Sequence, residues 1–149
     1  MIGSPAPARV QDSAGRQLRM VTAIFAVALL VHGSDHLRRG MDTVSSTVMV
    51  LGTVQLILAA VTIVLIYRNH RWAIPAAIGI GFVSAAGFIL VHLFPDWFGP
   101  FSDSFINAPA SARVNGFSWF AAIFEIAADV LLGIVALRVL RLAGRVQYA

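Results

Sequence analysis

Residues 44–67, VSSTVMVLGTVQLILAAVTIVLIY, decide the class of fold. Gln55 is the only strongly polar side chain in this run. At ~1.5 Å per residue, a helix of this length crosses the ~30 Å hydrocarbon core of a bilayer with some tilt. The composition agrees, because 58% of the residues are hydrophobic and only 12% are charged, which leaves too little polar surface for a soluble domain. The sequence therefore predicts an all-α integral membrane protein.

Three further apolar runs extend this prediction to a four-helix bundle within residues 18–142. The first run follows two arginines and has a core of signal-peptide length, but no small-residue cleavage site follows that core, so we expect it to stay as a helix. The third run carries Pro75 in its first turn, where a missing amide is tolerated. The predicted helices cover residues 18–37, 44–67, 72–94 and 117–137.

The segments outside these helices are expected to be a loop and two tails. Residues 95–116 contain three prolines and several aromatic rings that suit the headgroup boundary, such as Trp97 and Phe101. We expect this loop to lie over the mouth of the bundle. Residues 1–17 lack the periodicity of a packed element and are predicted to form a flexible cytoplasmic tail, and residues 143–149 a second cytoplasmic tail.

The positions of the arginines predict the orientation. With the N-terminus inside, eight arginines lie on the cytoplasmic side and three on the other side. The sequence therefore predicts an N-in/C-in topology with an extracytoplasmic loop. The arginines cluster at the ends of the apolar segments, so topology also explains the net charge of +4. The lipid bilayer is therefore the expected partner, and no nucleic-acid partner is expected. All the basic residues other than histidine are arginines, which indicates a GC-rich genome and a bacterial plasma membrane.

Small residues recur every four positions on the third helix, at Ala77, Gly81 and Ala85. Such a stripe lets a neighbouring helix backbone approach closely. We interpret it as a helix-packing surface, which also permits a homo-oligomer or a larger membrane complex.

Histidines and carboxylates within or next to the spans form the candidate site. They are His32, Asp35 and His36 on the first helix, His92 and Asp96 at the end of the third, and Glu125 and Asp129 on the fourth. The i, i+3 and i, i+4 spacings place the members on the first helix on one face, and likewise those on the fourth. An ionised carboxylate near the bilayer centre costs roughly 2.5–3.5 kcal/mol. We therefore expect Glu125 and Asp129 to face the bundle interior, either protonated or paired.

The first interpretation of this set is structural. Asp35 would pair with Arg38 or Arg39, and Glu125 with a polar group such as Gln55. The chain would then be a scaffold or an accessory subunit of a membrane complex, and the polar residues would fix the register of the helices.

The second interpretation is a metal site. His32 and His36 present two imidazoles on one helical face, and His92 with a carboxylate such as Glu125 would complete a tetrahedral set. Asp35, Asp96 and Asp129 would support it. Zinc or another transition metal suits these ligands, with zinc-assisted hydrolysis as one outcome, and haem suits them less well.

The third interpretation is proton-linked transport or sensing through protonatable groups at graded depth. Four helices without recognisable halves leave little room for alternating access unless the protein oligomerises. The chain contains no cysteine, which excludes thiolate chemistry, and no Walker loop, dinucleotide fingerprint, nucleophile elbow or HExxH motif. The sequence thus does not predict an enzyme, and the three interpretations stay open.

Overall fold

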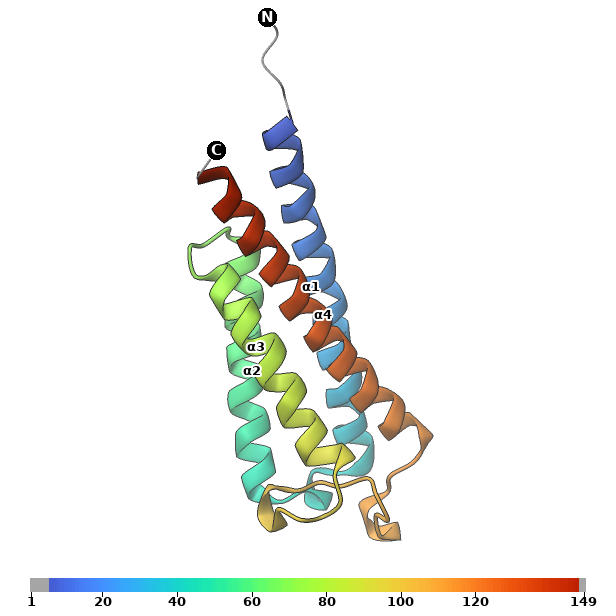
Figure 1. The fold of residues 1–149 in the computed structure, drawn as a ribbon. Coiled ribbons are helices and arrows are strands. Elements are labelled where there is room, and N and C mark those ends of the chain that lie inside the picture. The colour runs from blue at the N-terminus through green and yellow to red at the C-terminus, as the bar shows by residue number, and fades with distance from the viewer. Residues whose placement is uncertain (1–5, 148–149) are drawn as a thin grey trace, which may run out of the picture.

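The computed structural model describes residues 6–147 as an antiparallel bundle of four long helices (Figure 1). The helices are α1 (Ala6–Arg39), α2 (Ser46–Tyr67), α3 (Ala73–Phe88) and α4 (Gly116–Gln147). A π-helical turn, Ile89–Leu93, continues α3. All four helices are long and apolar enough to cross a membrane. The predicted all-α, four-helix membrane fold is confirmed.

The ends of two helices differ from the prediction. Helix α1 begins at Ala6 and α4 continues to Gln147, so parts of both predicted tails are helical. Polarity alone does not stop a helix, since Ala, Arg, Gln and Leu are good helix formers. Ala14 is also buried, which shows that the early part of α1 is packed. The rest of the two predicted tails, residues 1–5 and 148–149, lies outside the described residues.

Helix α4 is the centre of the packing, because it lies along both α1 and α3, whereas α2 packs mainly against α3. Helices α3 and α4 are in close backbone contact at Gly81. A Cβ atom there would lie 2.6 Å from the carbonyl oxygen of Asp129 and 2.7 Å from the amide nitrogen of Gly133. Ala77 and Ala85 are buried as well. The stripe of small residues therefore lies inside the bundle, with Gly81 directly against α4.

The interior of the bundle is divided into a polar half and an apolar half. In Figure 1 the loops before α2 and before α4 lie at the bottom, which we call the loop end; the start of α1 and the end of α4 lie at the other end, the termini end. The termini half is filled by an apolar core that includes Phe25, Ile80 and Leu132. The loop half instead buries His32, Asp35, Arg39, His92, Asp103, Ser118 and Glu125.

Residues 94–115, here called the interhelix loop, fold across the loop end (Figure 1). The amides of Asp103 and Phe105 donate to the carbonyls of Val91 and His92, at 3.1 and 2.9 Å, which fastens the loop to the π-helical turn. Phe105 is buried, whereas several other aromatic rings of the loop are exposed. Asn115 then caps α4, because its Oδ1 accepts from the amide of Phe117 at 2.9 Å.

Candidate metal centre

The three predicted histidines lie together in the loop half of the bundle. Each of His32, His36 and His92 offers a ring nitrogen such that all three atoms lie within 4.8 Å of one another. The Nε2 atoms of His32 and His36 are 3.0 Å apart. The ring centroid of His92 lies 5.0 Å from that of His32 and 6.0 Å from that of His36. We call this group the three-histidine site.

Two local features place these rings. The i, i+4 spacing of His32 and His36 puts both on the face of α1 that looks into the bundle. His92 lies in the π-helical turn, a type of turn that is frequent at functional sites. Phe88 packs edge-on against His32 at 4.9 Å, and Phe105 lies 4.6 Å from His92. The rings are therefore held by aromatic neighbours from α3 and the interhelix loop.

Oxygen atoms lie behind two of the three rings. Nδ1 of His92 is 3.1 Å from the carbonyl oxygen of Asp103 and 3.5 Å from its Oδ2. Nδ1 of His32 is 3.5 Å from Oε2 of Glu125. A histidine that binds a metal through Nε2 commonly has a carbonyl or carboxylate oxygen at its other nitrogen. The arrangement leaves Nε2 of His32 and of His92 for a shared ligand.

Asp103 is itself held by the buried Arg39, which the sequence offered only as an alternative partner for Asp35. The guanidinium of Arg39 donates to both carboxylate oxygens of Asp103, at 2.7 and 2.6 Å, and has no exposed surface. It also lies over the ring of Phe105, 5.2 Å from the centroid, and its Nε donates to the carbonyl of Ala112 at 2.8 Å. This ion pair joins the end of α1 to the interhelix loop.

The loop carboxylate that the sequence favoured has a different position. Asp96 is exposed, and among the described residues it makes no hydrogen bond or ion pair. Asp103 takes the place beside His92 instead. Local sequence cannot distinguish these two aspartates, because the contact of Asp103 with Arg39 spans 64 positions of the chain.

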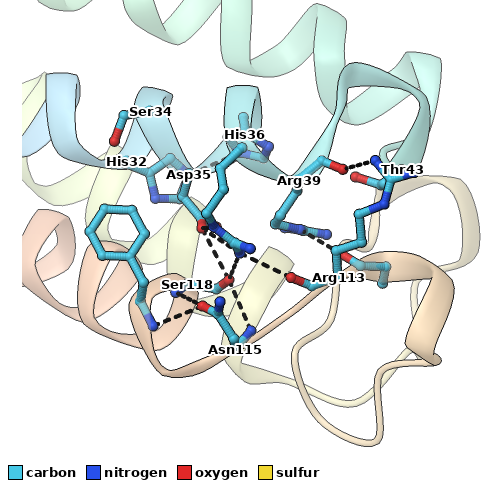
Figure 2. A network of polar contacts seen from close by, with 12 residues as sticks. His32, Ser34, Asp35, His36, Arg39, Thr43, Arg113, Asn115 and Ser118 are labelled. Atoms are coloured by element: carbon cyan, nitrogen blue, oxygen red, sulfur yellow. Dashed lines mark hydrogen bonds and ion pairs between the residues drawn. The ribbon is translucent and has the colours of Figure 1, made fainter.

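Asp35 belongs to a neighbouring polar network (Figure 2). Its Oδ1 lies 2.8 Å from Nη2 of Arg38 and accepts a hydrogen bond from Oγ of Ser118 at 3.2 Å. The expected pairing of Asp35 with Arg38 is thus present. Figure 2 shows that this network joins the end of α1 to the start of α4, beside the histidines.

Glu125 and Asp129 are 1% and 0% exposed, so the prediction that they face the bundle interior is confirmed. The expected bond between Glu125 and Gln55 is wrong, because Gln55 donates to Oγ of Ser84 at 3.3 Å. Within residues 6–147, neither carboxylate has a hydrogen-bond partner for either oxygen. Buried polar groups are normally satisfied, so these four oxygens call for an explanation.

Similarity to known proteins offers no assignment for this site. Comparison with protein-family models, with curated proteins and with solved structures finds no match for this chain. Any function of this site must therefore be inferred from the geometry of the chain itself.

Proposed function

We propose that this protein is an integral membrane protein that binds a transition-metal ion, of the class of zinc, at the three-histidine site. The observation that carries the proposal is the approach of three ring nitrogens to within 4.8 Å of one another. Two nitrogens that share a tetrahedral ion at ~2.0–2.1 Å lie about 3.3 Å apart. The 3.0 Å between His32 and His36 is close to this value, and the separations of up to 4.8 Å within the group would shorten when the three nitrogens bind one ion.

A purely structural role explains the site less well. One hydrogen bond joins His32 to His36, but the Nδ1 atoms of both rings are buried without a hydrogen-bond partner in the described chain. Residues that only fix helix register are expected to satisfy their buried polar atoms. Nδ1 of His32 faces Glu125, so an ion at the three-histidine site would not satisfy that atom; it would give the clustered ring nitrogens a common partner and would join α1 to α3.

The ligand atoms indicate the class of metal. Three imidazole nitrogens suit zinc, copper or iron, whereas magnesium and calcium prefer oxygen ligands. Haem fits poorly, because the imidazoles pack directly against one another and against Phe88, with His32 and His92 only 5.0 Å apart at their centroids. The three histidines leave a fourth coordination position for water or another ligand.

The N-in/C-in orientation is part of the proposal. Both ends of the described chain lie at the termini end, and that end carries the excess of arginine. In this orientation the three-histidine site lies in the extracytoplasmic half of a bacterial plasma membrane. An ion would reach it from outside the cytoplasm.

Metal analysis of the protein purified in detergent tests the proposal. After incubation with Zn²⁺ and desalting, we expect the His92→Gln and His36→Gln variants to hold one ion fewer per chain than the wild type. His70→Gln is the matched control, because His70 is an exposed histidine in the turn between α2 and α3. Wild-type protein without zinc, and without a zinc-induced thermal shift, would leave the scaffold interpretation standing.

A further inference from the structure

Five buried side-chain atoms on three residues of α1 and α4 have no hydrogen-bond partner among the residues that the structure describes. They are both carboxylate oxygens of Glu125, both of Asp129, and Nδ1 of His32. All three residues are more than nine-tenths buried. The two carboxylates occupy successive turns of α4, and Glu125 lies beside the imidazole of His32.

No cation of the described chain balances these carboxylates. Arg39 is committed to Asp103, and Arg38 to Asp35. Every other arginine whose side chain the structure describes is exposed. Unpaired charge in the bilayer interior is costly, and buried charges are normally paired or bound to a metal. The two carboxylates thus lack a positive partner that the chain itself could supply.

We propose that Glu125, Asp129 and Nδ1 of His32 form a second cation-binding position, which goes beyond the three-histidine site and shares only the His32 ring with it. The 3.5 Å between Nδ1 of His32 and Oε2 of Glu125 is long for a hydrogen bond. It is close to the separation of about 3.3 Å between two atoms that share a tetrahedral ion. Residues four apart on a helix have Cβ atoms about 5–6 Å apart, which lets the Asp129 carboxylate turn toward the same ion.

The ligand set gives the chemical class of the cation. Two carboxylates and one imidazole suit a divalent ion such as Mn²⁺, Fe²⁺, Co²⁺ or Zn²⁺. A neutral His32 ring carries one N–H proton. If ions occupy both positions at once, that proton leaves to solvent and the imidazole bridges the two ions.

The position is closed on the side of the termini. Beyond Asp129, the interior of α4 continues with Leu132 and Val135, which pack into the apolar core with Phe25 of α1. An ion therefore reaches the carboxylates from the loop end, past the three-histidine site. The two positions form a series that ends near the bilayer centre.

Counting bound Co²⁺ tests the second position. The full chain is purified in detergent, incubated with Co²⁺ alone and desalted, and cobalt is measured by elemental analysis. We expect two ions per wild-type chain, one in Glu125→Gln/Asp129→Asn and one in His92→Gln. Asp96→Asn, which removes an exposed carboxylate near the same end of the bundle, should keep two.

The outcomes separate this proposal from the histidine site. A single wild-type ion that is lost in His92→Gln overturns the second position and leaves the first standing. A single ion that survives His92→Gln but is lost in the carboxylate variant overturns the three-histidine site and leaves the second position standing. Two ions in the carboxylate variant also overturn the second position, and no cobalt in the wild type overturns both. If the double variant does not fold, as judged by its helical circular dichroism, the nearly isosteric Asp129→Asn variant decides by the same count.

Discussion

Replacing Asp103 with asparagine tests how the interhelix loop is held over the candidate metal centre. The carboxylate of Asp103 accepts hydrogen bonds of 2.7 and 2.6 Å from the buried guanidinium of Arg39. Asparagine has nearly the same shape but is neutral, and its amide offers one acceptor oxygen instead of two. The variant therefore leaves a buried positive charge unbalanced and one strong donor unpaired.

The size of the effect follows from the burial of the pair. Removing one partner of a buried ion pair costs about 3–5 kcal/mol, against a total stability of about 5–15 kcal/mol. At roughly 2–4 °C per kcal/mol for a chain of this length, Tm should fall by about 6–20 °C. Arg39 keeps its bond to the Ala112 carbonyl and its contact with the Phe105 ring, so we expect the lower half of this range.

Thermal unfolding followed by tryptophan fluorescence measures the effect. Trp119 is a suitable reporter, because its ring lies 5.6 Å from that of Phe105 beside the ion pair. Asp96→Asn is the control, since this exposed carboxylate has no partner in the described chain and its loss should change stability by less than about 0.5 kcal/mol. Equal Tm values for Asp103→Asn and Asp96→Asn would refute the argument that the ion pair stabilises the loop.

Three further predictions concern helix packing, topology and ion exchange. Gly81→Ala should destabilise the bundle by about 1–3 kcal/mol, because the added Cβ atom overpacks against the α4 backbone. In the control, Gly79→Ala, the added atom meets nothing within 4 Å and should not destabilise the bundle. Equal unfolding temperatures for the two variants would contradict the close contact of α3 with α4 at Gly81. The chain has no cysteine, so an introduced cysteine is the only thiol that can be labelled. Ser111→Cys should react with a membrane-impermeant thiol reagent in intact cells, and Asn69→Cys should not. Labelling of Asn69→Cys would overturn the N-in/C-in proposal. Asp103→Asn should release Co²⁺ faster than the wild type, as measured by competition with a chelator; equal rates would mean that the loop does not control exchange.

The helices and the three histidines were predictable because each depends on a local pattern. Apolar runs longer than the bilayer is thick predict spans whatever their partners. The i, i+4 pair on α1 fixes the relation of His32 to His36, and the position of His92 at the end of a span places it at the same depth. The start of α1 was not predicted in this way, because residues 6–17 have no apolar periodicity; Pro7 does not oppose the helix, since a first helical turn tolerates proline.

The partners of the histidines could not be predicted, because they depend on contacts between distant segments. Asp103 lies in a loop without hydrophobic periodicity, and its place beside His92 results from backbone bonds to the π-helical turn and from Arg39. Glu125 was singled out for its burial, but its position behind Nδ1 of His32 depends on how α1 and α4 are rotated against each other. A membrane helix that is apolar on most of its faces gives little information on that rotation.

The division of the interior determines the side from which an ion can reach the proposed sites. In the termini half, Phe25 and Leu132 are fully buried and α3 touches the backbone of α4 at Gly81, so a cation there would lose its hydration without gaining a ligand. In the loop half, an ion meets nitrogen and oxygen atoms at each step inward, and His36 is the least buried of the three histidines. On that side the described chain has the short connection before α2 and the interhelix loop, which the Arg39–Asp103 pair fastens to α1. If the three-histidine site binds an ion as proposed, its access should therefore depend on the interhelix loop more than on movement of the four helices.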